Sequence, residues 1–231
     1  VRTEAGSVVT SGSSGVVAVN RASTLLASDH SSITVTNYGT VNSGASLNLS
    51  GNAPAGLEAG YLGAATGFGA NANVYGNVVV NNYGNVAAAG GYGIHAYNYG
   101  NGDVTVNDGA GTTVIGAEIG IRAQALNGGS GNVTVTLGAN ASVKGATSYG
   151  ILAYSIDQGD ISVTLASGDS VISGSSGIVA VNYAAAIASV RQGSRATGSR
   201  RMATSMGIHL SGKVQAARWR VAAVVMTMSS R

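Results

Sequence analysis

The chain alternates between short apolar segments and polar corners, and this pattern repeats. A segment that opens with Gly recurs as GVVAVN from Gly15, GLEAGY from Gly56, GIHAYN from Gly93, GIRAQA from Gly120, GILAYS from Gly150 and GIVAVN from Gly177. A second apolar segment follows each of the first five, reading SITVTN, NVVVNN, DVTVND, NVTVTL and DISVTL. Repetition with a period of a few tens of residues indicates stacked units, each too small to bury its own apolar face.

Apolar and polar residues alternate within these segments, so one face of each predicted strand belongs to a core. The second segments direct Val104, Val133 and Ile161 inward, and the first segments do the same for residues such as Ile94. A third segment, such as TTVIG, completes each unit. Three short strands per turn, joined by Gly, Asn, Asp and Ser corners, predict an all-β, three-sided parallel β-helix over residues 1–190. Each strand then pairs with its copies in the neighbouring coils at about 4.8 Å.

One corner of the predicted coil varies in length. From Val78 onward the intervals from a second strand to the next first strand are 16, 17, 18 and 17 residues, whereas from a first to a second strand they range from 10 to 21. The longest connection contains AATGFGANANVYG, residues 64–76. Variable loops on one face of a solenoid are the usual place for binding. The candidate recognition residues are therefore Phe68, Asn71, Asn73 and Tyr75, and deletion of 64–76 is expected to weaken attachment.

Polar residues recur at fixed corner positions. Asn77, Asp103, Asn132 and Asp160 each precede a second strand, and Asn residues also recur at the ends of first strands. Side chains of this kind satisfy turn amides, so stacked hydrogen-bonded ladders are the leading interpretation, with a glycan-binding row as the alternative. The corner tyrosines are expected to stack between coils, and exposed rings could also stack on sugars.

Composition supports a folded repeat and excludes several classes of protein. The chain has 36 Gly, 45% hydrophobic residues and only 9% charged residues, so it is glycine-rich yet has enough apolar side chains for a core. The absence of Cys excludes a disulfide framework and thiolate metal sites. No apolar run approaches the ~20 residues of a membrane-spanning helix, and no secretory leader is visible at the first residues.

The pattern resembles the passenger segments of bacterial autotransporter adhesins and related secreted haemagglutinin-like proteins. The GI-A-N/Y and NVTV alternation, the TNYGTVNSG and NNYGNVAAAG corners and the lack of Cys carry this resemblance over residues 1–190. It implies a right-handed parallel β-helix that is exported and displayed at the bacterial cell surface or released. It also implies an outer-membrane β-barrel anchor in the full-length protein, and no matching series of alternating strands is present in these residues.

Charge divides the chain into two regions. Residues 1–190 carry four basic and nine acidic side chains, a net charge of −5, whereas residues 191–231 carry eight basic side chains and no acid. The period also ends there, after an IASV segment placed close to where another second strand is due. We expect an irregular or disordered tail over 191–231 and interpret it as the product of a reading-frame change near residue 190. A natural basic tail for nucleic acid or anionic lipid is the alternative.

The sequence offers little convergent chemistry, so it predicts a non-enzymatic binding scaffold without cofactor, metal or nucleic-acid partner. The partner would be a host-cell or sister-cell glycan or protein, or matrix. Two alternatives stay open, a passive stalk and a polysaccharide-degrading β-helix that uses Asp103 and Asp160, about 9–10 Å apart at the same corner two coils away. His30 and His209 are scattered, and His95 is expected to be an outward, solvated side chain.

Overall fold

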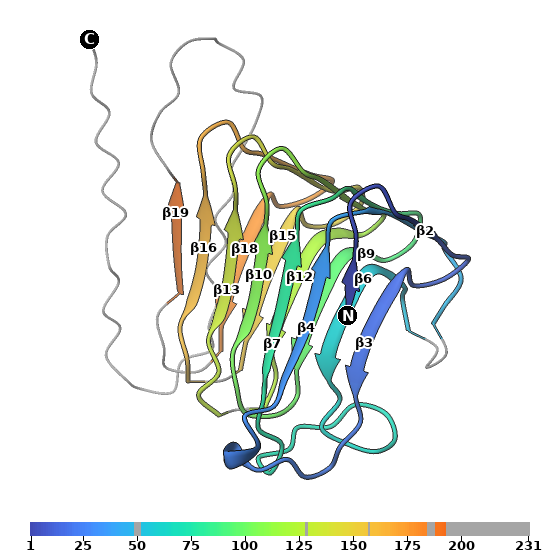
Figure 1. The fold of residues 1–231 in the computed structure, drawn as a ribbon. Helices are drawn as coiled ribbons and strands as arrows, with labels where there is room; N and C mark the ends of the chain where they lie inside the picture. Colours follow the sequence, from blue (N-terminus) through green and yellow to red (C-terminus); the bar gives the residue numbers. More distant parts are fainter. Residues whose placement is uncertain (49–51, 128, 157, 184–187, 193–231) are drawn as a thin grey trace, which may run out of the picture.

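The protein is a stack of coils with three strands per coil (Figure 1). The computed structural model describes residues 1–48, 52–127, 129–156, 158–183 and 188–192. Three parallel sheets form its sides, and every third strand belongs to the same sheet. This arrangement confirms the predicted all-β class and the three-sided parallel β-helix. Of the irregular tail expected over 191–231, Arg191 and Gln192 belong instead to the strand Ala188–Gln192, and the remainder lies outside the described residues.

Each sheet collects one type of segment. Sheet A contains the second segments and is ordered β1 (Arg2–Thr3), β4 (Ser32–Asn37), β7 (Asn77–Asn82), β10 (Val104–Asp108), β13 (Val133–Leu137), β16 (Ile161–Leu165) and β19 (Ala188–Gln192). Sheet B contains the third segments: β2 (Val8–Thr10), β5 (Thr40–Ser43), β8 (Val86–Ala88), β11 (Thr113–Gly116), β14 (Ser142–Gly145) and β17 (Ser170–Ser173). Sheet C contains the Gly-led segments: β3 (Val16–Asn20), β6 (Ala55–Tyr61), β9 (Tyr92–Asn98), β12 (Ile119–Ala125), β15 (Ile151–Ser155) and β18 (Ile178–Asn182). A single-turn 3-10 helix, η1 (Ala27–Asp29), precedes β4.

Equivalent residues form columns along the axis. Val104 pairs with Val133, and Val133 pairs with Ile161, in unbroken parallel register. All three side chains are fully buried, as is Ile94 of sheet C. The inner faces of the three sheets therefore share one apolar core, toward which period-two alternation directs every second side chain.

The Gly that opens each sheet C strand lies where two sheets come close together. A methyl group on Gly93 would lie 2.6 Å from Cγ1 of Val114 and 2.6 Å from the carbonyl oxygen of Gly120. The equivalent Gly177, which precedes the last Gly-led strand, has no such neighbour within 4 Å among the residues that the structure describes. The recurrent Gly of the sequence thus reflects close packing between sheet C and the valines of sheet B.

A polar ladder runs through the interior at the ends of β4, β7 and β10 of sheet A. Asn37, Asn82 and Asp108 occupy paired positions and are almost completely buried. Nδ2 of Asn37 donates to Oδ1 of Asn82 at 2.7 Å, and Nδ2 of Asn82 donates to Oδ1 of Asp108 at 2.7 Å. Leu137 takes the next position of the column, so the amide ladder ends at a carboxyl group.

Helices contribute little to the described part of the chain. Among the described residues the helical element is the three-residue η1. No helix in this part of the chain is long and apolar enough to cross a membrane.

Candidate recognition surface

The corner between sheets C and A, called the C–A corner below, is held together by the predicted side-chain ladder. The backbone N–H of Asp103 donates to Oδ1 of Asn77 at 2.9 Å, and the N–H of Asn132 donates to Oδ1 of Asp103 at 2.8 Å. The N–H of Asp160 donates in turn to Oδ1 of Asn132 at 2.8 Å. Each Asx side chain thereby caps the turn of the next coil, which confirms the structural interpretation of this row.

A groove of about 650 Å³ lies along the C–A corner. Successive coils contribute to it, so it runs in the direction of the axis; we call it the corner groove. Its walls are Ala27, His30, Ser31, Ser32, Tyr75, Gly76, Asn77, Asn101, Gly102, Gly129, Ser130 and Gln158. Hydroxyl, amide and phenol groups dominate this lining, which is the chemistry of hydrogen bonding to neutral polar ligands and of stacking on sugar rings.

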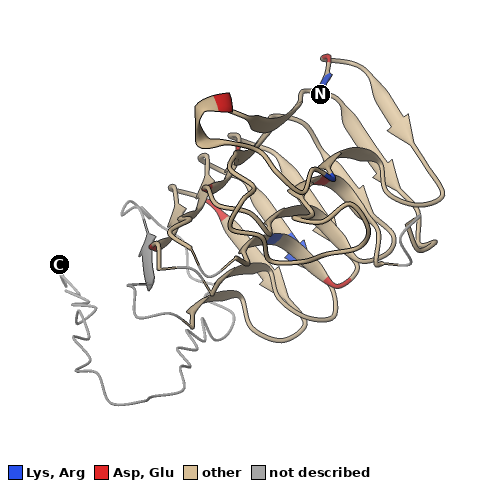
Figure 2. Ribbon diagram, turned by 90° about the horizontal axis from the view of Figure 1, so that it is seen from below, with Lys and Arg blue, Asp and Glu red and all other residues tan. Residues whose placement is uncertain are grey.

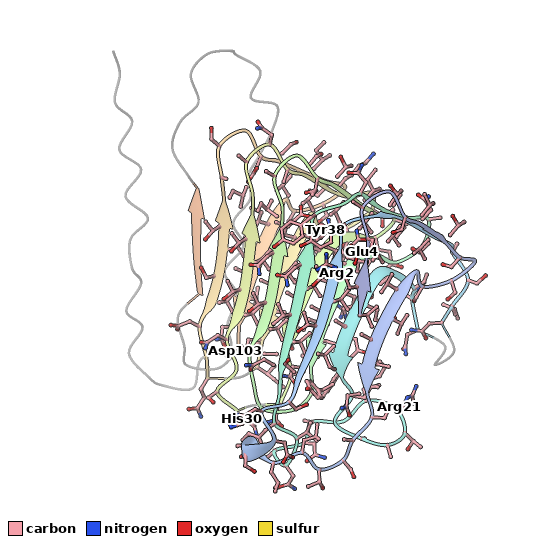
Figure 3. The ribbon with its side chains drawn as sticks, in the orientation of Figure 1. Arg2, Glu4, Arg21, His30, Tyr38 and Asp103 are labelled. Carbon is pink, nitrogen blue, oxygen red and sulfur yellow. The ribbon has the colours of Figure 1, made fainter. Side chains whose placement is uncertain are left out.

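Figure 3 shows where this corner lies. His30 and Asp103 lie at the end of the molecule where the long loops are. Arg2, Glu4 and Tyr38 lie toward the opposite ends of the strands. Tyr38 there stacks on Tyr83, with ring centroids 5.0 Å apart, as expected for tyrosines at equivalent corners.

The four sequence-predicted recognition residues occupy one connection but have different surroundings. Tyr75 is 41% exposed and lines the corner groove. Asn71 holds the loop closed, because its Nδ2 donates to the carbonyl groups of Ser23 and Gly63, and its Oδ1 accepts from the N–H of Asn73. Phe68 is not among the residues that line the groove, and its ring packs against those of Tyr97 and Tyr99.

Part of this connection is structural. Val74 is fully buried in the core and forms a β-bridge with Leu25. Deletion of the whole segment 64–76 would therefore open the core as well as remove the loop. Single substitutions at exposed positions are the better test of recognition.

The outer face of sheet C carries a cluster that sequence reasoning missed. Phe68 contacts the rings of Tyr97 and Tyr99, with centroids 5.6 and 5.3 Å apart. Arg122 of β12 lies over the ring of Tyr92 at 4.9 Å and donates from Nη1 to its hydroxyl group. The sequence did contain a signal for this cluster. Aromatic residues occupy outward positions of neighbouring Gly-led segments, and the longest loop contains a Phe.

His95 corrects a prediction. It points outward, in the same column as Glu58 and Arg122, but it is half-buried instead of fully solvated. Desolvation, reinforced by the charge of Arg122, lowers its pKa to about 3, and its Nε2 lies 3.2 Å from Oε1 of Gln124. The ring of Tyr97 covers the imidazole of His95, with ring centroids 4.8 Å apart. Strand alternation alone does not indicate such a contact.

Glu58 is a second outward residue that the fold buries. Its side chain is 5% exposed and accepts hydrogen bonds from Ser14 and Tyr97, at 3.2 and 3.3 Å. Burial raises the pKa of Glu58, and these hydrogen bonds oppose the rise. The outer face of sheet C is therefore partly covered along its middle strands, where Glu58, Tyr97 and Gln124 are buried.

The charged residues of the described chain are sparse and do not converge (Figure 2). Asp103 and Asp160 occupy the same corner two coils apart, as predicted, and Oδ1 of Asp103 is engaged by Asn132. Among the described residues, no group of three or more His, Cys, Asp or Glu side chains is arranged to hold a metal ion.

Comparison with known proteins leaves the fold as the basis for functional reasoning. No protein-family model, curated protein or solved structure matched the chain.

Proposed function

We propose that this chain is a surface-displayed or secreted binding scaffold of the adhesin type. Attachment to a cell-surface glycan or protein, or to matrix, takes place at the C–A corner. The supporting observation is that the corner with the longest connection, between β6 and β7, carries an open polar groove with an exposed aromatic ring, Tyr75. The rest of the coil supplies a rigid rod that projects this corner.

The protein then acts outside the cell, at the bacterial surface or in the medium, and an outer-membrane β-barrel would anchor it there. The composition and corner sequences that resemble autotransporter passengers support this location. A β-helix suits the role because each coil is stabilised by its neighbours and loops can vary on one side without disturbing the stack.

Binding along such a corner is distributed. Each coil contributes one to three polar side chains to the groove, and successive coils are about 4.8 Å apart. A ligand that follows the groove thus makes several weak contacts, and aromatic stacking supplies the strongest of them.

The test uses beads coated with the purified chain and a panel of bacterial cells, host cells, matrix proteins and glycans. Tyr75→Ala is expected to reduce attachment several-fold, while the β-sheet circular dichroism stays unchanged. Tyr83→Ala is the matched control, because it removes a 49% exposed tyrosine from the corner between sheets A and B. Equal attachment by wild type and Tyr75→Ala, or an equal loss in Tyr83→Ala, would contradict recognition at the C–A corner.

A further inference from the structure

The corner groove extends along the axis over five coils. Its lining includes residues from the turn before each of five successive sheet A strands: Ser31, Tyr75, Asn101, Ser130 and Gln158. These turns are in backbone contact, since Tyr75 forms a β-bridge with Asn101 and the N–H of Gln158 donates at 2.6 Å to a carbonyl oxygen of the coil before it. Four steps of about 4.8 Å give a length of roughly 19 Å. The groove therefore suits an elongated ligand that lies parallel to the axis.

The groove presents hydrogen-bonding groups that the fold does not use. The hydroxyl groups of Ser32, Tyr75 and Ser130 and the side-chain amide of Gln158 form no hydrogen bond within the described structure. Asn77 accepts through Oδ1 from the backbone of the next coil, while its Nδ2 has no partner there. All five side chains are exposed, so a ligand reaches these groups without displacing a contact of the coil.

The charges at this corner favour an uncharged ligand. Among the described residues that line the groove, none is Lys, Arg, Asp or Glu, so neither an anion nor a cation finds an ion-pair partner in the lining. Asp103 and Asp160 lie beside the groove in the corner ladder, and the coil region has a net charge of −5. Their electrostatic field repels anions.

A peptide strand fits the groove poorly. Strand addition needs a row of unpaired backbone groups, but at this corner the N–H of Gly76 donates to the carbonyl oxygen of Asn101 at 2.9 Å, and the N–H of Asn101 to that of Val74 at 2.6 Å. Peptide recognition also needs apolar pockets, whereas the apolar part of the described lining is Ala27 and the ring of Tyr75. An uncharged sugar chain needs the opposite, a ring for stacking and many partners for its hydroxyl groups.

From this geometry we infer that the corner groove binds an uncharged, extended oligosaccharide parallel to the coil axis, with about one sugar unit per coil step. One pyranose ring lies against Tyr75. Sugar units on either side of it form hydrogen bonds with Ser32 in one direction and with Ser130 and Gln158 in the other. The inference rests on the proposed function and deepens it by naming the ligand class of the same surface. Two sources share this chemistry, neutral glucans and chains of N-acetylated amino sugars.

The experiment follows the backbone amide signals of Gly102 and Ser130 by NMR in the ¹⁵N-labelled full chain. The probes are cello-oligosaccharides and chito-oligosaccharides from disaccharide to hexasaccharide, malto-oligosaccharides, whose chains curl, and oligogalacturonates, which carry a carboxylate on each unit. We expect the affinity for at least one extended neutral series to rise with each added unit and to level off at about four or five units, the length of the groove. Oligogalacturonates of equal length should bind about tenfold or more weakly. The series that binds more tightly identifies the source.

Two variants place the ligand along the groove. Tyr75→Ala should weaken the binding of every chain length by about three- to tenfold, because it removes the stacking contact that all of them share. Gln158→Ala, at the far end, should reduce the gain in affinity between disaccharide and hexasaccharide by about threefold. Tyr83→Ala, which removes an exposed tyrosine outside the groove, should bind as wild type does. The backbone amide spectrum of each variant verifies that the coil is intact.

Several results would overturn the inference. These are no binding of either extended neutral series, affinity that does not depend on chain length, wild-type affinity in Tyr75→Ala, or binding of malto-oligosaccharides or oligogalacturonates as tight as that of the extended neutral chains. The titration involves no cells, so its failure is separable from that of the proposed function. Attachment that depends on Tyr75 without oligosaccharide binding removes only the ligand class, whereas oligosaccharide binding without attachment removes only the adhesive role.

Discussion

Replacement of Asp108 by Asn should stabilise the protein at neutral pH. Asp108 is 2% exposed at the end of the interior amide ladder, and burial raises its pKa from 3.8 to about 6. Its Oδ2 is buried with no hydrogen-bond partner among the described residues. The ionised form of the Asp108 side chain therefore lowers the free energy of unfolding.

The magnitude follows from the difference between the two pKa values. A shift from 3.8 to about 6 corresponds to about 3 kcal/mol, at about 1.4 kcal/mol per unit. Below pH 3.8 the carboxyl group is protonated in both states and costs nothing. As the pH rises from 3.8 to about 6, Asp108 loses its proton in the unfolded chain but keeps it in the folded protein, so folding stability falls, and the full penalty applies above pH 6.

An Asn at position 108 would complete the ladder. Nδ2 of Asn37 donates to the carbonyl oxygen of Gly39 at 3.1 Å, and Nδ2 of Asn82 donates to that of Gly84 at 2.9 Å. The same geometry in the Asp108→Asn variant would direct its amide to the carbonyl oxygen of Ala110. Its Oδ1 would still accept from Asn82.

Urea unfolding at intervals from pH 4 to pH 8 measures the effect. Asp108→Asn should equal wild type near pH 4 and exceed it by up to about 3 kcal/mol above pH 7. Glu58 also has a raised pKa, but it is present in both proteins and cancels in the difference. Asn82→Asp, which adds a second carboxyl group to the ladder, should change stability in the opposite direction. A variant no more stable than wild type at pH 7–8, or a gap that does not depend on pH, would refute the reasoning.

Three further predictions address the scaffold and its corner. Gly93→Ala should destabilise the coil by about 1–3 kcal/mol in urea unfolding, since the added methyl group meets Val114 and the backbone, whereas Gly177→Ala should be neutral; equal effects would contradict the close approach. Asn132→Ala removes the acceptor of the Asp160 N–H and should lower the free energy of unfolding by about 1 kcal/mol, with no change expected if the ladder contributes nothing. Wild type should release no reducing or unsaturated sugar from a polysaccharide panel, and release that Asp160→Asn abolishes would favour the enzymatic alternative.

The sequence predicted the scaffold because one simple rule governs it. Period-two alternation and nearly constant spacing determine which residues point inward, and residues such as Val104 and Val133 therefore pair as expected. The corner ladder from Asn77 to Asp160 was also predictable, since Asx residues at a repeated turn have few other uses.

The outer face of sheet C was not predictable in the same way. Whether an outward residue is solvated depends on what its neighbours and the loops place over it, and alternation does not contain that information. His95 and Glu58 share the outward face with Arg122, yet both are desolvated. The interior position of Asn37 and Asn82 was likewise hidden, because a buried amide is stable only if its partners in adjacent coils complete its hydrogen bonds.

Distances between spin labels along one outward column test the stacking of the coils most directly. Thr34 is followed in register by Val79, Thr105, Thr134 and Ser162. Since the chain has no native Cys, labels can be attached to Cys pairs at 34 and 134, and at 34 and 162. The account predicts backbone separations of about 14 and 19 Å, three and four steps of about 4.8 Å. Separations that do not increase by about one strand spacing between the two pairs would contradict it.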